Sequence, residues 1–282
     1  MIKTVKRING KSVFFYRSEI IPCPHGFFGA ELDFNKNTCQ ADALRQNIDT
    51  AAKILGFEPR RLVSVKQIHS ASVREVGADD GGKFYFRAAD FDCDGYVTQE
   101  SGTALGIRTA DCVPILLCAA DRKGSVAAVS AVHAGWRGTV GKIAAEAVSK
   151  LCKLGASTEN IYAAVGPSIC PDCFEVGEDF RVEVSEKLGS AICQKYVTPK
   201  ANSNGKYLAD LWAMNAEQLM SCGIPENNID ICRICTRENN VLSTSENRPD
   251  SSSGVGFFSH RAQGTPHGTQ ISIIVMPYIS IQ

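Results

Sequence analysis

Two apolar segments separated by a short polar turn place the strongest constraint on how this chain folds. Residues 113–121 read VPILLCAAD and residues 125–132 read SVAAVSAV, and the charged residues of this region cluster where the first segment ends. Neither segment shows the polar alternation of a strand with one face in water, so both are typical of strands buried inside a sheet. The pair predicts the centre of a β-sheet.

The patterns elsewhere predict further strands and helices. Strands are expected over residues 12–18, 61–76 with a break near His69, 95–99, 103–109, 160–166, 229–235, 256–261 and 269–276. Helices are expected over residues 42–56, 139–155, 180–192 and 208–223, where apolar residues recur at helical spacing. A long polar loop is expected over residues 237–256. Strands and helices alternate irregularly, which predicts mixed sheets flanked by helices in one domain spanning residues 1–282.

Composition excludes several classes of partner. The 282 residues are 44% hydrophobic and 21% charged, with 30 basic and 30 acidic side chains. This balance predicts neither a nucleic-acid-binding surface nor a basic membrane-binding face. The N-terminal residues lack the apolar core of a signal peptide, and no segment has the length of a membrane span. We expect a cytoplasmic protein.

Twelve cysteines are the compositional outlier. A reducing compartment favours free thiols, metal ligands or a nucleophile over disulfide bonds. Two CxxC pairs occur, Cys170 with Cys173 and Cys232 with Cys235. Two such pairs can form a structural zinc site. The alternative is simple packing, which the strand pattern around Cys232 favours because positions i and i+3 of a strand face opposite sides.

Three residues at the ends of apolar strands are candidates for chemistry: His69, Cys112 and His133. One thiolate and two imidazoles suit zinc, and three protein ligands leave a fourth position for water or substrate. The long spacings form no local metal motif, so packed or hydrogen-bonded residues are the alternative. Asp94 or Asp111 can orient a liganding imidazole, or can serve as an ordinary turn carboxylate.

The turn after His133 carries unusual residues for a strand-to-helix connection. Residues 131–139 read AVHAGWRGT, which places a bulky aromatic and a fixed positive charge beside two glycines. The guanidinium of Arg137 can bind phosphate or carboxylate through paired hydrogen bonds. Trp136 can form a wall of a pocket, stack on a purine or serve packing alone. No Walker loop and no GxGxxG fingerprint is present.

These motifs make the chain resemble the laccase-domain family, also called YfiH-like or peptidoglycan-editing-factor-like proteins. The motifs that carry the resemblance occur in family order and cover nearly the whole chain: HGF at 25–27, QIH at 67–69, DCDGYVT at 92–98, TADCVPILL at 109–117, HAGWRGT at 133–139, GPSICPDCFEVG at 166–177, DLWAMNAEQL at 210–219, CT at 235–236 and FFSHR at 257–261. The resemblance implies an α+β fold with two central mixed sheets and outer helices, layered in the order αββα.

The resemblance also implies an activity and a cofactor. His69, Cys112 and His133 would bind one catalytic Zn²⁺. The family is credited with phosphorolysis of adenosine, inosine, guanosine and S-methyl-5'-thioadenosine, and with adenosine deamination, so the expected partners are purine nucleosides and phosphate. Arg137 and Trp136 would contact substrate. Relatives often carry an arginine just after the asparagine of the first helix. Here Ile48 follows Asn47, and Arg45 is the candidate substitute.

Four other functions stay open at this point. One is a metal-stabilised binding or scaffolding protein, which would bind zinc but release no product from any nucleoside. A Cys–His hydrolase would use Cys112 as nucleophile and His133 as base. Bacterial members of the family are linked to editing of peptidoglycan precursors. Older labels describe copper-dependent polyphenol oxidases, which makes Cu²⁺ an alternative metal, although multicopper sites need more imidazoles than five histidines provide.

Overall fold

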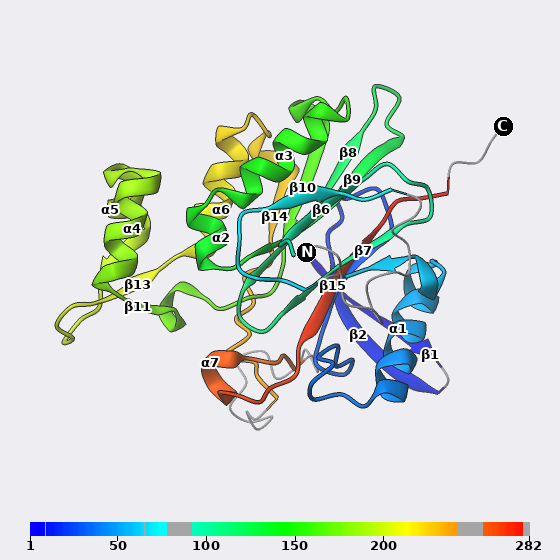
Figure 1. Cartoon of the computed structure of the whole chain (residues 1–282), viewed down its shortest axis with the longest axis horizontal. Helices are drawn as coiled ribbons and strands as arrows, with labels where there is room; N and C mark the ends of the chain where they lie inside the picture. The colour runs from blue at the N-terminus through cyan, green and yellow to red at the C-terminus, as the bar shows by residue number, and fades with distance from the viewer. Residues whose placement is uncertain (9, 65, 78–91, 242–255, 279–282) are drawn as a thin grey trace.

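The computed structural model describes residues 1–8, 10–64, 66–77, 92–241 and 256–278 (Figure 1). Within these residues the strands form two large sheets and one small sheet. The first sheet runs in the order β1–β2–β3–β15–β7–β4, with the bounds β1 Ile2–Ile8, β2 Lys11–Arg17, β3 His25–Phe28, β15 Gln270–Val275, β7 Ala104–Thr109 and β4 Leu62–Val63. Most of the predicted loop at 237–256 lies outside the described residues.

The second large sheet contains the two apolar segments that most constrain the fold. It runs in the order β14–β10–β8–β9–β6–β5, with the bounds β14 Ile229–Ile231, β10 Ile161–Val165, β8 Val113–Ala120, β9 Val126–Ala134, β6 Gly95–Thr98 and β5 Val73–Glu75. β8 and β9 pair antiparallel at its centre, which confirms the prediction of central strands. Both large sheets are mixed, because β4 pairs parallel with β7 and β5 pairs parallel with β6.

Helices cover the outer faces of the two sheets. Their bounds are α1 Ala41–Leu55, α2 Trp136–Val140, α3 Ile143–Lys153, α4 Glu178–Leu188, α5 Ser190–Tyr196, α6 Leu211–Ser221 and α7 His260–Gln263. Alternate residues of β8 show the layering, because Ile115 packs with α3 and α6 while Leu116 packs with Leu105 of the other sheet. α1 packs on the outer face of the first sheet. The resulting αββα order confirms the expected fold class.

A smaller unit extends from this body. The third sheet consists of β11 Glu175–Gly177, β13 Lys206–Ala209 and β12 Val197–Pro199, and α4 and α5 lie beside it at the left of Figure 1. Short 3₁₀ turns connect other elements: η1 Pro59–Arg61, η3 Thr158–Asn160, η4 Pro171–Cys173 and η5 Glu226–Asn228. No described helix has both the length and the apolar character needed to cross a bilayer.

Several predicted elements have different bounds in the structure. The helix predicted over residues 139–155 is two helices, α2 and α3, because Lys142 takes a left-handed φ of 63° between them. The helix predicted over 180–192 is likewise divided into α4 and α5 at Gly189, whose φ is 96°. The strand predicted over 256–261 is a single bridge at Phe257 followed by α7.

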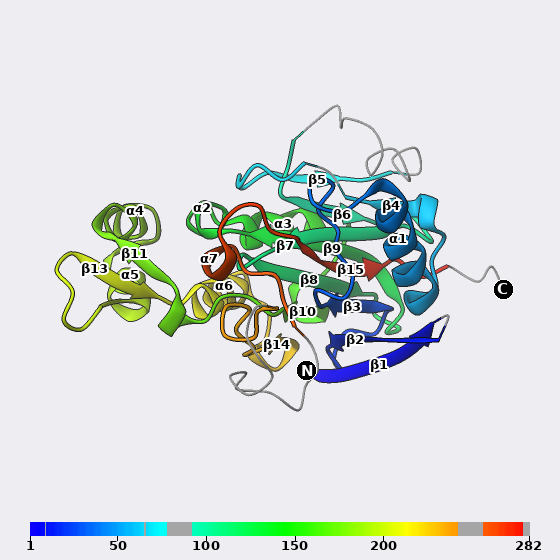
Figure 2. The ribbon, with the colours of Figure 1, turned by 90° about the horizontal axis from the view of Figure 1, so that it is seen from below.

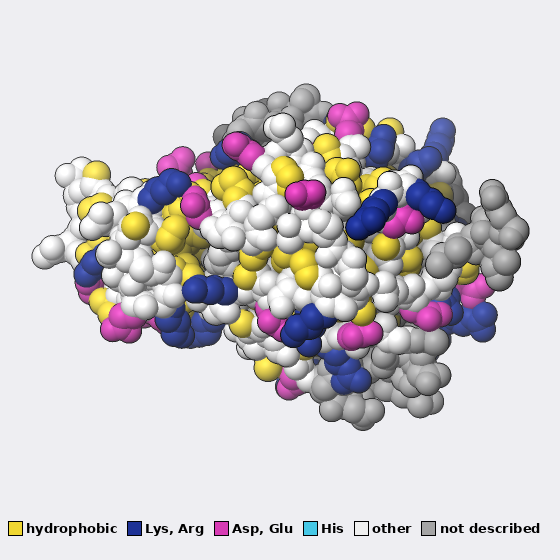
Figure 3. Space-filling view, turned by 90° about the horizontal axis from the view of Figure 1, so that it is seen from above, with side chains coloured by type: hydrophobic (Ala, Val, Ile, Leu, Met, Phe, Trp, Pro, Cys, Tyr) yellow, Lys and Arg dark blue, Asp and Glu magenta, His cyan; other side chains and the backbone are white. Residues whose placement is uncertain are grey.

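Neither the surface charge on the face shown in Figure 3 nor the cysteines depart from the expectations of the sequence. On the face shown in Figure 3, basic and acidic side chains are interspersed among neutral and apolar ones. All twelve cysteines lie within the described residues as free thiols, and most are buried.

Candidate metal centre

The three predicted metal ligands come together at one point of the structure. His69 lies between β4 and β5, Cys112 lies in the turn between β7 and β8, and His133 lies near the end of β9. Their ligand atoms all lie within 4.8 Å of one another, and Nε2 of His69 is 3.8 Å from Sγ of Cys112. His133 is buried, Cys112 is half-buried and His69 is exposed, so the group opens to solvent on the His69 side.

Strand pairing at the centre of the second sheet brings two of these ligands together. In the antiparallel register of β8 and β9, Pro114 stands opposite His133. Cys112 precedes that pair by two residues, and therefore emerges from the sheet beside the histidine. On the other side of β9, Gly95 of β6 stands opposite Val132, which places Asp94 next to His133. The buried strands thus fix the ligand positions before any metal binds.

Asp94 is the residue that links the two histidines. Its side chain is fully buried, and its Oδ1 accepts a hydrogen bond of 2.8 Å from Nδ1–H of His133. The same carboxylate accepts hydrogen bonds from the backbone N–H groups of His69, at 2.9 Å, and Ser70, at 2.6 Å. A carboxylate on one ring nitrogen fixes the tautomer and leaves the other nitrogen for a metal. Of the two aspartates predicted for this role, Asp94 is the one whose carboxylate contacts the His133 ring.

Asp111 has a different function in the same region. Its Oδ1 accepts a hydrogen bond of 2.7 Å from the Thr236 hydroxyl, and its Oδ2 accepts one of 2.7 Å from the Arg261 backbone N–H. Asp111 itself has a φ of 91°, a strained value for a residue other than glycine. These contacts hold the Cys112 turn against two distant segments. The sequence contained no signal for the partners, because they lie 125 and 150 positions away.

The ligand group leaves no room for a side chain at Gly135. A Cβ atom there would lie 2.9 Å from Cδ2 of His69 and 3.3 Å from Sγ of Cys112. The φ of Gly135 is −61°, which any residue adopts, so proximity to the ligands rather than backbone freedom explains this glycine. Gly138 is similar, since its Cβ would lie 3.0 Å from the Ser70 carbonyl oxygen.

Cys112 and His133 form an ionised pair in the metal-free chain. Burial raises the pKa of Cys112, but the positive charge of His133 and hydrogen bonds from His133 and His69 outweigh burial and lower the pKa to about 6. Burial lowers the pKa of His133, but the Cys112 thiolate and the hydrogen bond to Asp94 raise it to about 9. The pair is therefore thiolate and imidazolium near neutral pH. A thiolate is the form of cysteine that binds metals.

Two of the predicted substrate residues lie at the start of α2. Trp136 is half-buried and packs edge-to-face on Phe180 of α4, with ring centroids 5.5 Å apart. Arg137 is exposed, and its guanidinium lies 4.3 Å from the centroid of the Trp136 ring. One face of the indole is therefore covered by Arg137. Both residues follow His133 by three and four positions, at the start of the helix that leaves β9.

The third predicted substrate residue is placed elsewhere. Arg45 is exposed on α1, which packs on the first sheet. Figures 1 and 2 show α1 at the right of the main body and α2 at its left in both views. Arg45 therefore lies on a helix of the other sheet, whereas Trp136 and Arg137 begin the helix after the His133 strand. The substrate contacts of all three residues stay predictions.

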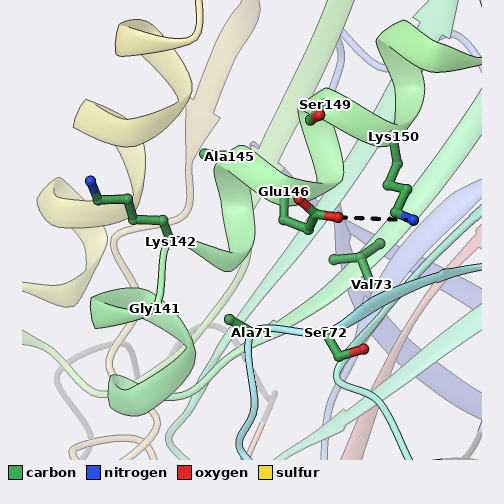
Figure 4. Close-up of a pocket in the computed structure, with 9 residues that line it drawn as sticks. All are labelled: Ala71, Ser72, Val73, Gly141, Lys142, Ala145, Glu146, Ser149 and Lys150. Atoms are coloured by element: carbon green, nitrogen blue, oxygen red, sulfur yellow. Dashed lines mark ion pairs between the residues drawn. The ribbon is translucent and has the colours of Figure 1, made fainter. Parts of the chain in front are cut away.

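A groove of about 560 Å³ lies beside the ligand group (Figure 4). Its walls are residues 71–73, which follow His69 by two positions, and the first turns of α3. Glu146 and Lys150 form an ion pair of 3.9 Å along it. None of the three ligands lines this groove, so it is a neighbouring surface rather than the opening of the metal centre.

Comparison with known families and proteins finds clear similarity. A family model described as multi-copper polyphenol oxidoreductase laccase matches residues 30–277. Adenosine deaminase RL5, from an unknown prokaryotic organism, is 39% identical over 216 residues, which cover 74% of this chain and 78% of that protein. A purine nucleoside phosphorylase of Bacteroides thetaiotaomicron is 33% identical, over 70% of this chain and 72% of that protein.

Solved structures agree with the fold. The crystal structure of YlmD from Geobacillus stearothermophilus is 25% identical and superposes with a TM-score of 0.76, covering 98% of this chain and 100% of that one. The crystal structure of the hypothetical protein YfiH from Bacillus licheniformis, also 25% identical, gives a TM-score of 0.74 over 89% of this chain and 92% of that one.

Proposed function

The chain belongs to the family described as multi-copper polyphenol oxidoreductase laccase, and from this premise we propose that it is a zinc-dependent purine nucleoside phosphorylase with adenosine deaminase activity. The proposed substrates are adenosine, inosine, guanosine and S-methyl-5'-thioadenosine, with phosphate as the second reactant. The names of two relatives support the reaction classes, a purine nucleoside phosphorylase and an adenosine deaminase. The observation that carries the proposal is the convergence of His69, Cys112 and His133 on one point.

The ligand set supports zinc more than a multicopper centre. Two imidazoles and one thiolate are preferred zinc donors and leave one position open. A multicopper oxidase needs many more imidazoles, and the remaining three histidines of the chain are engaged elsewhere. His260 and His267 contact each other at 3.1 Å, and His25 contacts the Cys23 carbonyl oxygen at 2.8 Å. These contacts favour a single metal ion at the centre.

Each residue around that ion has a separate role in the proposed reaction. Zinc, when bound, supplies Lewis acidity and lowers the pKa of a coordinated water. Asp94 holds the His133 ring and the His69 backbone, so both imidazoles are fixed before substrate arrives. Arg137 supplies a permanent positive charge for phosphate. Trp136 forms part of the wall of the substrate pocket. Phe180 and Arg137 contact its ring and hold it in place.

Phosphate dependence of base release tests the proposal. Purified protein is incubated with each nucleoside with and without phosphate, and the products are identified by mass. The proposal predicts free base and sugar 1-phosphate only with phosphate, and inosine from adenosine without it. Cys112→Ala should abolish both, whereas Cys118→Ala, a buried thiol in β8 packed between the sheets, should retain both. Zinc-loaded protein that converts none of the nucleosides would contradict the assignment.

One observation favours a second candidate function. The thiolate–imidazolium pair of Cys112 and His133 is also the nucleophile and base of a covalent Cys–His hydrolase. That enzyme would keep its activity in the presence of a chelator and lose it on alkylation of Cys112. The zinc enzyme would lose activity with chelator, and bound zinc would protect Cys112 from alkylation.

A further inference from the structure

A second group of side chains with metal-ligating atoms lies next to the turn that carries Cys112. The Sγ atoms of Cys170, Cys173 and Cys235 all lie within 4.8 Å of one another, and all three residues are buried. We call these three residues the thiol cluster. Cys170 and Cys173 flank and end the short turn η4, and Cys235 follows β14 in a segment that pairs with Ser168. Two segments about 65 positions apart in the chain therefore build the cluster.

The thiol cluster contains three of the four cysteines that form the two CxxC pairs of the sequence. Cys235 joins Cys170 and Cys173 on the α3–α6 side of the second sheet. Cys232 points to the opposite side and packs in the core between the two large sheets. Both cysteines lie just after β14, in a segment whose backbone still pairs with residues 165–168, and they face opposite sides of it. Cys232 provides a natural control, because it is buried in the same segment but outside the cluster.

The surroundings of the cluster suit thiolate ligands on a cation. Nη1 of Arg237 lies 3.3 Å from Sγ of Cys173, and the backbone N–H of Cys170 donates to Sγ of Cys235 at 3.3 Å. Such donors stabilise metal-bound sulfur. Oε1 of Glu238 lies 3.8 Å from Sγ of Cys173, on the open side of the cluster. Three sulfurs and one carboxylate oxygen make a four-donor set for zinc.

The spacing of the sulfurs also fits this ion. Zinc binds thiolate at about 2.3 Å, so a tetrahedral site places two sulfurs about 3.8 Å apart. The present sulfur separations are all within 4.8 Å, which is at most about 1 Å above that value. Burial and the neighbouring thiols raise the pKa of Cys170, and burial raises the pKa of Cys235.

We propose that Cys170, Cys173 and Cys235, with Glu238, bind a second zinc ion that clamps the turn carrying Cys112. The backbone N–H of Ile169, next to Cys170, donates to the Asp111 carbonyl oxygen at 3.0 Å. The hydroxyl of Thr236, next to Cys235, donates to the Asp111 carboxylate at 2.7 Å. An ion joining these two segments holds both of them against the residue before Cys112. The second site is structural, and it does not depend on the reaction at the first.

Zinc content of purified full-length variants tests the second site. We expect two zinc ions per wild-type chain, one in Cys112→Ala, one in Cys235→Ala and none in the double variant. The matched control Cys232→Ala should retain two. Zinc content in Cys235→Ala equal to wild type would overturn the proposal, as would a Cys112→Ala protein without zinc. If the first site fails to bind zinc, the wild-type chain still contains one ion, lost in Cys235→Ala and kept in Cys112→Ala.

Cobalt substitution distinguishes a lost ligand from a misfolded chain. Co²⁺ bound to thiolates gives a near-ultraviolet charge-transfer band whose intensity grows with the number of sulfur ligands. In the Cys112→Ala background this band should persist with the intensity of three thiolates, and Cys173→Ala should reduce it by about a third while circular dichroism stays unchanged. A disulfide between two of the three cysteines in protein purified with reductant, or no band in the Cys112→Ala background, would overturn the proposal.

Discussion

At the scale of single residues, Asp94 explains why the two histidines are usable as ligands. It contacts both of them from one buried position, and the burial penalty on its charge is more than offset by hydrogen bonds from His133 and Ser70, which lower its pKa to about 2. The carboxylate therefore stays ionised throughout the range in which proteins are handled. A residue that orients ligands in this way acts on metal affinity rather than on substrate directly.

Replacing Asp94 should weaken metal binding without unfolding the chain. Asp94→Asn keeps the size of the side chain but removes its charge, so the His133 ring loses its fixed tautomer. We expect zinc affinity to fall by about 10–100-fold, measured by competition with a chromogenic chelator. Asp92→Asn is the matched control, because Asp92 is exposed two positions away and contacts Lys66. Equal losses in the two variants would contradict the role given to Asp94.

The close contact of Gly135 with the ligands leads to a second prediction at the scale of single residues. In Gly135→Ala the new methyl group meets His69 and Cys112, so the ligands must separate. We expect loss of bound zinc and of nucleoside turnover. Gly141→Ala creates a similar clash at 2.8 Å, but against Ala71 and not against a ligand. It should lower the melting temperature and leave the zinc content unchanged. Metal loss in both variants would show that general strain, and not ligand crowding, is responsible.

The pKa of Cys112 sets the pH dependence of its reactivity in metal-free protein. Because His133 and His69 hold this pKa at about 6, the thiolate predominates above pH 6 and is protonated below it. We expect alkylation of Cys112 by iodoacetamide to slow as the pH falls through about 6, as followed by peptide mass analysis. Cys118, buried in β8, is the internal reference. A midpoint near the ordinary thiol pKa would mean that the histidines do not stabilise the thiolate.

At the scale of elements, the apolar pattern predicted where strands and helices occur, but not where two of the helices break. Buried segments such as β8, β9 and α1 are close to their predicted bounds because burial of their side chains fixes both type and length. The helix breaks at Lys142 and Gly189 were missed because the apolar spacing continues across both. Glycine is a local stop signal at each break, since Gly141 ends α2 and Gly189 ends α4.

The strained break at Lys142 predicts a stabilising substitution. Lysine at a left-handed φ of 63° costs about 1 kcal/mol that glycine does not. Lys142→Gly should therefore raise the free energy of unfolding by up to about 1 kcal/mol, measured by urea denaturation. Ser149→Gly, at an exposed interior position of α3, should lower it by about 0.5 kcal/mol. Destabilisation by both glycines would mean that the Lys142 side chain makes compensating contacts.

At the scale of the whole molecule, the metal centre lies where the chain crosses between the two large sheets. β4 and β7 belong to the first sheet, and β5 and β8 belong to the second. His69 lies on the crossing from β4 to β5, and Cys112 on the crossing from β7 to β8. The motifs around these residues predicted them as candidate ligands from the sequence, and the structure brings their ligand atoms together. The crossings, and with them the thiol cluster, depend on contacts between distant segments that no local pattern records. The single domain over residues 1–282 stays a prediction.

This placement predicts that metal removal loosens the whole fold as well as stopping the reaction. Ligands on two crossings and on β9 tie the sheets together, so zinc binds the native state and not the unfolded chain. At a free zinc concentration 100 times the Kd, one site contributes about 2.7 kcal/mol. For a chain of this size that is roughly 5–10 °C in melting temperature.

A chelator should abolish phosphorolysis and deamination together and lower the melting temperature, and added zinc should restore all three. The Cys112→Ala, Cys235→Ala double variant should show no response to either. Activity that survives chelation while the melting temperature falls would favour the Cys–His hydrolase, because only the structural role of the metal would then remain.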